Sequence, residues 1–223
     1  VKDPQVGMHD WVMSFDLNSL YPNIIVQYNM SPETLLTMPG AEGATASNGA
    51  VFTKAKKGII PEIVEELYDK RVIVKKEMLE AKTKLETISK RQRNEYAATT
   101  AQAARLETLQ TAIKILMNSL YGAMGNKYFR YFDLRIASGI TLTGQEVIKY
   151  AETNVNNYLD EFIGESKDRV IAMDTDSLYI GVKDVIDKFK PNNPVSFLDE
   201  FGSKAIELQG GYGQGGFIGT LGL

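Results

Sequence analysis

Two aspartates, Asp174 and Asp176, lie one residue apart inside an otherwise apolar run, VIAMDTDSLYIGV (170–182). Residues i and i+2 of a regular strand face the same side, and at a tight turn both side chains can point away from the end of the sheet. Two carboxylates this close repel each other unless a divalent cation neutralises them. A set of oxygen ligands without Cys or clustered His favours Mg²⁺ or Mn²⁺ over zinc.

A lone Asp-x-Asp pair is equally typical of a polar β-turn, because Asp is a standard turn residue. Asp16 favours the metal hypothesis, since it also ends an apolar strand, in WVMSFD. Three carboxylates at the ends of two strands in one sheet would make a two-metal site. Such sites hold their ions roughly 3.5–4 Å apart and act on both the attacking and the leaving oxygen in phosphoryl transfer.

A second set of candidates lies in two long helical segments. Lys114, Asn118 and Tyr121 follow i, i+4, i+7 spacing and therefore share one helix face, and Arg71 and Lys75 are i, i+4 neighbours. Residues 54–93 contain twelve Lys and Arg against seven Asp and Glu, although the whole chain has a net charge of -3. Concentrated positive charge is typical of phosphate binding, while a solvated helix face is the commoner explanation for any single charge.

The apolar pattern predicts the elements that must position these residues. A strand ends near Asp16, and Pro22 favours a helix start just after it. A Gly/Ala/Ser-rich stretch, residues 39–50, is typical of a surface loop. Helical patterns from Pro61 and over about 95–121 predict an antiparallel helical hairpin roughly 40 Å long.

The later part of the chain predicts a further helix and a β-hairpin. GAMGN (122–126) breaks the second long helix, and a helix over about 135–159 follows. The strands RVIAM and SLYIGV, joined by the polar turn DTD, then make the hairpin. Strand, helical hairpin, helix and β-hairpin in this order predict an α+β fold rather than alternating βαβ units.

Composition bounds the class of protein. The chain has 223 residues, 43% of them hydrophobic and 24% charged, which suits one large domain or two small ones. No apolar run approaches the roughly 20 residues of a membrane span, so no membrane partner is expected. The absence of Cys excludes disulfides and thiolate metal sites and fits a reducing cytosol. The last fifteen residues contain seven glycines, and we expect residues 209–223 to be a frayed tail.

Three blocks occur in order: DLNSLYPNII (16–25), KILMNSLYGAMGN (114–126) and MDTDS (173–177). Together they resemble motifs A, B and C of the family B DNA polymerases. NMSPET and NKYFRYFDLR are most similar to the replicative polymerases of T-even-type bacteriophages, and the resemblance covers about residues 10–205. Three blocks in order at sensible spacing are far more specific than any one alone.

The resemblance implies an α+β polymerase palm, an antiparallel sheet with packed helices, that carries a helical-hairpin fingers subdomain. Residues 1–60 would be the first part of the palm and 61–113 the fingers hairpin. Residues 114–208 would be the end of the fingers and the second part of the palm, before the tail at 209–223.

The resemblance also implies a role for each matching residue. Asp16 and Asp176 match the carboxylates that hold two catalytic Mg²⁺ ions (Mn²⁺ being possible), Leu17 matches a backbone ligand, and Asp174 matches a supporting carboxylate. Tyr21 resembles the residue that excludes a ribose 2′-OH by steric clash. The implied nucleotide-binding residues are Ser19, Leu20, Tyr21, Arg71, Lys75, Lys114 and Asn118, and the implied DNA-binding residues are Tyr121 and Gly122.

Two positions depart from the family pattern. Asn23 stands where Ser is usual, and Met173 where Gly or Tyr commonly precedes DTDS. Neither residue type is a metal ligand here, so we expect these differences to tune the site. The resemblance further implies an exonuclease domain before residue 1 and a thumb after the tail. The implied partners are primer-template DNA, dNTPs, these remaining domains and a sliding clamp, in the cytoplasm of an infected bacterial host.

The implied activity is that of a DNA-directed DNA polymerase, a nucleotidyltransferase. Other hypotheses predict different features. A glycosyltransferase with an Asp-x-Asp motif would need a parallel nucleotide-binding fold and no basic helical hairpin. An aspartic protease would need Gly where Asp176 stands. The chain could also be an inactive fragment, or one piece of a split polymerase, that binds only nucleotide or DNA.

Overall fold

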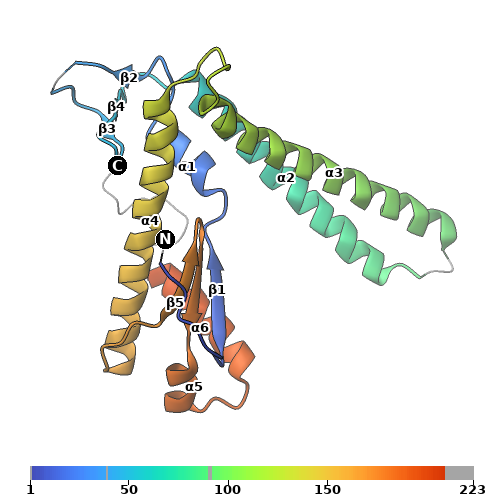
Figure 1. Ribbon diagram of the computed structural model, residues 1–223. Coiled ribbons are helices and arrows are strands. Elements are labelled where there is room, and N and C mark those ends of the chain that lie inside the picture. The colour runs from blue at the N-terminus through green and yellow to red at the C-terminus, as the bar shows by residue number, and fades with distance from the viewer. Residues whose placement is uncertain (1, 39, 90–91, 209–223) are drawn as a thin grey trace. The chain divides into compact units, whose positions relative to one another are not determined.

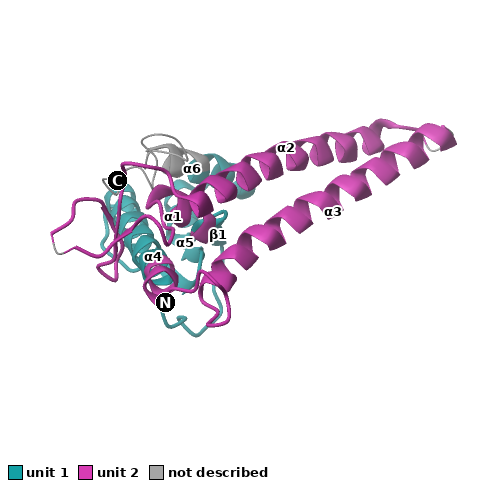
Figure 2. Ribbon diagram, turned by 90° about the horizontal axis from the view of Figure 1, so that it is seen from above, with its two compact units in different colours: residues 1–20, 141–223 teal, residues 21–140 magenta. Residues whose placement is uncertain are grey.

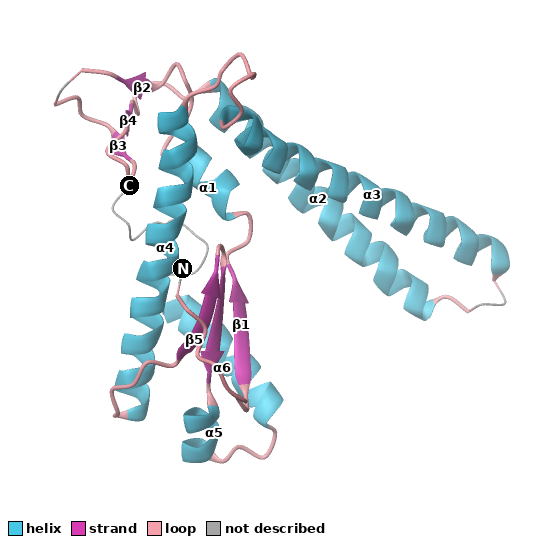
Figure 3. Ribbon diagram, in the orientation of Figure 1, coloured by secondary structure: helices cyan, strands magenta, loops and turns pink. Residues whose placement is uncertain are grey.

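The computed structural model describes residues 2–38, 40–89 and 92–208 (Figure 1). In these ranges the chain forms six helices and two small three-stranded antiparallel sheets, so the predicted α+β class is confirmed (Figure 3). The predicted tail, residues 209–223, lies outside the described residues. Two compact units divide the chain: unit 1 comprises residues 1–20 and 141–223, and unit 2 comprises residues 21–140 (Figure 2).

Unit 1 contains the sheet that carries the aspartates. Its strands are β1 (Val12–Asp16), β5 (Val170–Asp174) and β6 (Ser177–Gly181), with β6 in the middle and both pairings antiparallel. The predicted β-hairpin is β5 and β6, and the predicted strand ending at Asp16 is β1. The strand that follows the turn therefore pairs with the first strand of the chain, which no local pattern specifies.

One face of this sheet is packed and the other is open. Alternate residues such as Phe15, Met173 and Leu178 enter the unit 1 core, while Asp16, Asp174 and Tyr179 are exposed. Helices of the unit cover the packed face: α4 (Leu134–Ile163) from residue 141 onward, α5 (Lys183–Phe189) and α6 (Pro194–Leu208). The helix expected over about 135–159 corresponds to α4, whereas the sequence pattern does not predict α5 and α6.

A buried arginine joins three elements of unit 1. The Arg169 side chain is 1% exposed and donates to the Asp160 carboxylate of α4 at 2.6 Å and to two backbone carbonyls, those of Glu165 and Lys167. Asp184 of α5 lies 3.5 Å from Nε. The hydrogen bonds to Asp160, led by the Lys167 N–H, lower the pKa of this carboxyl. The start of β5 is thereby attached to the end of α4 and to α5.

Unit 2 is dominated by the predicted helical hairpin. Helices α2 (Ile59–Thr87) and α3 (Arg93–Met124) run antiparallel, with Val74 packed against Ile113 and Met117 (Figures 1 and 2). Helix α1 (Leu20–Gln27) contains Pro22 in its first turn, as expected. The stretch predicted as a loop contains β3 (Ala44–Thr45), which with β2 (Leu35–Leu36) flanks β4 (Val51–Phe52) in a second small sheet.

The N-terminus of α2 is capped by residues far away in the sequence. The Glu33 carboxylate accepts from the Ile59 N–H at 2.6 Å, and the Ser31 hydroxyl accepts from the Ile60 N–H at 3.5 Å. Pro61 has no N–H to satisfy. The N–H groups in the first turn of any helix lack an intrahelical partner. In α2, those of Ile59 and Ile60 are bound by side chains of the NMSPET segment, residues 29–34.

Asn29 fixes the chain that leads into α2. It has a positive φ of 56° and is 7% exposed. Its amide donates to the carbonyls of Thr53 (2.7 Å) and Lys56 (2.8 Å) and accepts from the Gly58 N–H (2.7 Å). One buried side chain therefore holds the chain in place where the long helix begins.

Within the described residues, no helix is both long and apolar enough to cross a membrane.

Candidate active site

The three aspartates are brought to one end of the unit 1 sheet. Asp16 pairs with Ser177 across β1 and β6, and Asp174 pairs with the same Ser177 across β5 and β6. The Leu17 N–H donates to the Asp176 carbonyl at 2.7 Å, which ties the residue after β1 to the hairpin turn. Figure 1 shows this end of β1 beside the β5–β6 turn. Strand pairing thus makes Asp16 a neighbour of hairpin residues that follow it by 158 or more positions in the sequence.

The turn holds its two carboxylates differently. Thr175 has a positive φ of 47° and donates its hydroxyl to Asp174 at 3.1 Å, while the Ser177 hydroxyl donates to the Asp174 carbonyl at 3.1 Å. Asp174 is exposed and Asp176 is half-buried. Ser177 belongs to the MDTDS block, but the sequence indicates no role for it, because its central place between the aspartates follows only from the strand order.

The carboxylates have the chemistry that suits a hard cation, but their side chains do not form a ready-made metal site. Asp16 and Asp174 are exposed, and all three groups offer the oxygen ligands that Mg²⁺ prefers. In the described part of the chain, however, no three or more His, Cys, Asp and Glu side chains group closely enough to hold a metal ion. The backbone brings the donors to one edge, and the side chains would have to turn toward a bound ion.

The segment after Asp16 turns sharply into α1. Ser19 has a positive φ of 56°, and Leu20 is 3% exposed, so a role of Leu20 at a ligand would involve its backbone. Tyr21 and Tyr121 lie in unit 2 with ring centroids 4.8 Å apart at an interplanar angle of 38°. Partial burial raises the pKa of Tyr121. These two predicted site residues, 100 positions apart, are in direct ring contact.

The predicted phosphate-binding residues flank one level of the hairpin. Val74 packs against Ile113 and Met117, and the sequence neighbours of these three core residues include Lys75, Lys114 and Asn118, all exposed. Arg71 lies one turn before Lys75 on α2 and is half-buried. Lys75 and Lys114 form no ion pair anywhere in the described ranges. Beside this part of the hairpin core, the surface therefore carries two lysines without an ion-pair partner among the described residues, which favours an anionic ligand.

Gly122 occupies open space. A Cβ added there would meet no heavy atom within 4 Å, and the residue is exposed in the last turns of α3. Among the described residues, nothing occupies the space that a side chain at this position would need.

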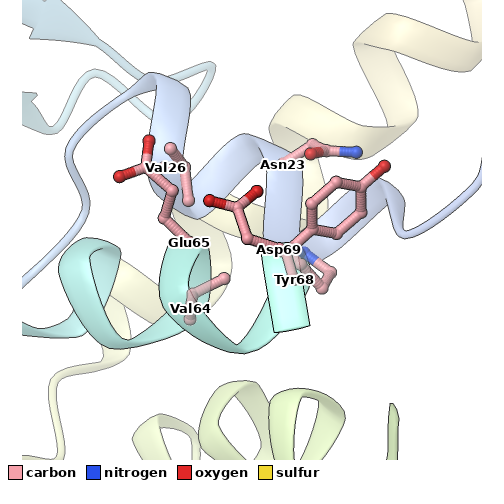
Figure 4. A pocket seen from close by; sticks show the side chains of 7 residues that line it. Asn23, Val26, Val64, Glu65, Tyr68 and Asp69 are labelled. Atoms are coloured by element: carbon pink, nitrogen blue, oxygen red, sulfur yellow. The ribbon is translucent and has the colours of Figure 1, made fainter. Parts of the chain in front are cut away.

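A pocket of about 180 Å³ lies between α1 and α2 in unit 2 (Figure 4). The lining includes Asn23 and Tyr68 together with two carboxylates, Glu65 and Asp69. Glu65 is paired with Lys57. Because acidic groups repel phosphates, this pocket does not suit a nucleotide, and the exposed cations on α2 and α3 fit one better.

Comparison with known proteins identifies the family. The DNA polymerase family B model matches residues 1–190. The chain is 33% identical to the DNA-directed DNA polymerase of Escherichia phage RB69, over 93% of this chain and 29% of that protein. It is 33% identical to the enzyme of Enterobacteria phage T4, over 93% and 30%. It is 30% identical to DNA polymerase 1 of Pyrococcus abyssi, over 98% and 26%.

The chain spans less than a third of the length of these relatives. The resemblance to family B polymerases that the three sequence blocks predicted is confirmed, and so is the likeness to T-even-type phage polymerases that NMSPET and NKYFRYFDLR predicted. The family match spans all three blocks, all of unit 2 and unit 1 up to residue 190. This chain therefore belongs to DNA polymerase family B.

Proposed function

We propose that this chain is the palm and fingers part of a DNA-directed DNA polymerase, which adds deoxynucleoside monophosphates to a primer 3′-OH in phage DNA replication. The observation that carries the proposal is the meeting of Asp16, Asp174 and Asp176 at one edge of an open-faced sheet. Asp16 ends β1, and Asp174 and Asp176 lie at the turn between β5 and β6. These strands pack against the core on one face, which makes a rigid support for a ligand.

Asp16 and Asp176 would bind two Mg²⁺ ions together with the Leu17 carbonyl, with Mn²⁺ as a substitute, and Asp174 would support them. When bound, such ions lower the pKa of an attacking hydroxyl and neutralise the charge of the leaving group. The protein's own task is to hold these oxygens at the sheet edge. The exposure of Asp16 and Asp174 supports this assignment, because both side chains can turn toward a bound ion without disturbing the core.

Arg71, Lys75, Lys114 and Asn118 would bind the triphosphate of the incoming dNTP, with Ser19, Leu20 and Tyr21 beneath it. The unpaired state of Lys75 and Lys114 among the described residues supports this role, since neither cation has to leave an internal partner. Tyr21 would exclude a ribose 2′-OH, braced by the ring of Tyr121. Tyr121 and Gly122 would contact the nascent base pair.

The test is a primer-extension assay with Asp176→Asn, which keeps the side-chain size and removes the charge. We expect extension to be lost while primer-template binding, followed by fluorescence anisotropy, remains measurable. Asp187→Asn, at an exposed carboxylate on α5, is the matched control and should extend normally. Near-normal extension by Asp176→Asn would disprove the metal assignment.

A second candidate is that the chain alone only binds nucleotide or DNA. Its support is the coverage of less than a third of the phage enzymes. The proposed partners then include an exonuclease domain, a thumb domain and a sliding clamp, acting in the cytoplasm of the bacterial host. Extension by the 223-residue chain alone, compared with the chain supplemented by the remaining domains in trans, separates the two candidates.

A further inference from the structure

The turn between β3 and β4 contains Asn48 and Gly49, the one place in the sequence where glycine follows asparagine. Both residues are exposed, and Gly49 has a positive φ of 81°, which glycine adopts without strain. The turn is closed by two backbone hydrogen bonds of 2.8 Å, from the Gly49 N–H to the Ala46 carbonyl and from the Ala46 N–H to the Ala50 carbonyl. Because Gly49 has no side chain, its nitrogen is also unhindered toward the side chain of Asn48.

The Asn48 side chain reaches across to the start of α4. Its amide donates to the Arg135 carbonyl at 2.7 Å and to the Ser138 hydroxyl at 3.0 Å, and its oxygen accepts from the Ala50 N–H at 3.1 Å. A Cβ at the buried Gly139 would lie 3.2 Å from the Asn48 oxygen, so the helix approaches this turn closely. Both donors of the amide and its oxygen are therefore bound, and one side chain attaches the small sheet of unit 2 to α4.

An asparagine before glycine can react with its own backbone. The Gly49 nitrogen attacks Cγ of Asn48, so that an N–C bond forms and the Cγ–Nδ2 bond breaks. The proton of the Gly49 amide and the departing NH₂ group leave together as ammonia. Water then opens the five-membered imide at either carbonyl, which restores a peptide N–H and leaves a carboxyl group. The product is aspartate or isoaspartate, and water is the only co-reactant.

The folded turn keeps the two reacting groups from this step. The Gly49 nitrogen is engaged with the Ala46 carbonyl, and the Asn48 amide is held by α4 and by the Ala50 N–H. Attack on Cγ therefore requires the side chain to leave α4 and the turn to open. After the reaction the same attachment cannot form again, because a carboxylate has no N–H to donate and the Arg135 carbonyl would face a negative charge.

We propose that Asn48 is a deamidation site that the fold protects, and that its conversion to a carboxylate detaches the β3–β4 turn from α4. A protected group reacts only while its segment is locally open, so the rate at Asn48 reports how often this turn leaves the helix. All the groups involved belong to unit 2, and the inference does not depend on the polymerase activity.

The first test incubates the 223-residue chain in mildly alkaline buffer, folded or in concentrated urea, and follows Asn48 by peptide mapping with mass spectrometry. We expect the reaction to be slower in the folded chain by roughly tenfold or more, because several hydrogen bonds must break together. Ser138→Ala removes one partner of the Asn48 amide and should raise the rate in the folded chain without changing the rate in urea. Ser119→Ala is the matched control, since this exposed serine of α3 also bonds the carbonyl four residues before it, at 2.8 Å, and should leave both rates unchanged.

The second test compares the thermal unfolding of Asn48→Asp with that of the wild type. We expect Asn48→Asp to lower the Tm by about 2–4 °C, the shift that the loss of a net hydrogen bond gives in a chain of this size. Asn94→Asp, the same change at an exposed asparagine in the first turn of α3, should not lower the Tm, because an acidic group is favourable there. Equal reaction rates at Asn48 in the folded and unfolded chain, no reaction in urea, or an unchanged Tm in Asn48→Asp would overturn the proposal.

Discussion

At the scale of single residues, the three aspartates have unequal surroundings although they share one sheet edge. Asp174 is exposed and accepts a hydrogen bond from the Thr175 hydroxyl, whereas Asp176 is half-buried at the point where the Leu17 N–H attaches β1 to the turn. Asp16 ends the neighbouring strand. A difference in surroundings predicts a difference in role.

The first prediction concerns the two exposed members of this set. We expect Asp16→Asn to lower the extension rate by about 10³-fold or more, because a carboxylate that binds the catalytic ions stabilises the transition state by several kcal/mol. Asp174→Asn should lower the rate clearly less, since we propose only a supporting role for this carboxylate. Single-turnover extension at saturating dNTP measures both rates. Equal decreases in the two variants would contradict the assignment.

The second prediction concerns the ring contact between Tyr21 and Tyr121. Tyr21→Ala should raise the incorporation of ribonucleotides relative to deoxyribonucleotides, because it removes the ring that we propose excludes the 2′-OH. Tyr121→Ala should raise it to a smaller extent, since an aromatic pair contributes about 0.5–1.5 kcal/mol to holding a ring in place. The ratio of kcat/KM for dCTP and CTP reports both effects. Tyr21→Phe is the control and should preserve the ratio.

At the scale of elements, the start of α2 depends on groups supplied by the NMSPET segment. Although partial burial opposes ionisation of Glu33, hydrogen bonds from the Ser31 hydroxyl and the Ile59 N–H hold its pKa below the usual value. Ionised Glu33 also lies at the positive end of the helix dipole. The long hairpin is thereby anchored at one end by a charge-assisted contact.

This anchor predicts a pH dependence of stability. A depressed folded-state pKa contributes stability above the unfolded value of 4.5, and this contribution disappears as the pH falls through the lower folded value. Glu33→Ala should cost about 1 kcal/mol at pH 7. Urea unfolding at about pH 7 and at successive acidic values measures the difference. A gap between wild type and variant that does not narrow in acid would refute the role of the charge.

Two glycines of unit 2 provide a matched pair. A Cβ at Gly58 would lie 2.7 Å from the Ser31 Cβ, so Gly58→Ala must move the chain at the start of α2 and should cost about 1–3 kcal/mol. Gly122→Ala meets open space inside α3 and should stabilise the chain by up to about 1 kcal/mol through helix propensity. Thermal unfolding reports both. Gly122→Ala should nevertheless impair extension, because we propose that DNA approaches closely there.

At the scale of the whole molecule, the chain contains two units, each with a core of its own. The sheet and its helices share one core, which includes Leu178, and the hairpin has another around Met117. We expect Leu178→Ala to accelerate amide exchange mainly in β1, β5 and β6, and Met117→Ala to accelerate it mainly in α2 and α3. Each should cost about 2–5 kcal/mol of local stability. Hydrogen–deuterium exchange with peptide resolution measures this, and uniform acceleration in both variants would show one cooperative unit.

The whole chain also differs in content from its phage relatives. The alignment with the RB69 enzyme extends over 266 residues, although this chain has only 223, so that enzyme contains residues within the span that have no counterpart here. The alignment with the Pyrococcus abyssi enzyme extends over 228 residues.

The sequence by itself determined the types of the main elements and the identity of the candidate residues. Helical periodicity located α2, α3 and α4, and alternation around a polar turn located the β5–β6 hairpin, because these signals depend on neighbours within one or two turns. It also supplied the three blocks that led to the family. It did not reveal α5, β2, β3 or β4, whose short patterns carry too little periodic information, nor α6, although that helix has 15 residues.

Only the tertiary structure decided which of these pieces meet. The central place of β6, the position of Ser177 between two aspartates and the attachment of Leu17 to Asp176 all arise from pairing between distant segments. The Glu33 cap on α2 and the ring contact of Tyr21 with Tyr121 are equally non-local. Such contacts form only when the packing of a whole unit outweighs the chain entropy lost on folding. A short stretch of sequence does not reveal that balance, because it depends on residues far apart in the chain.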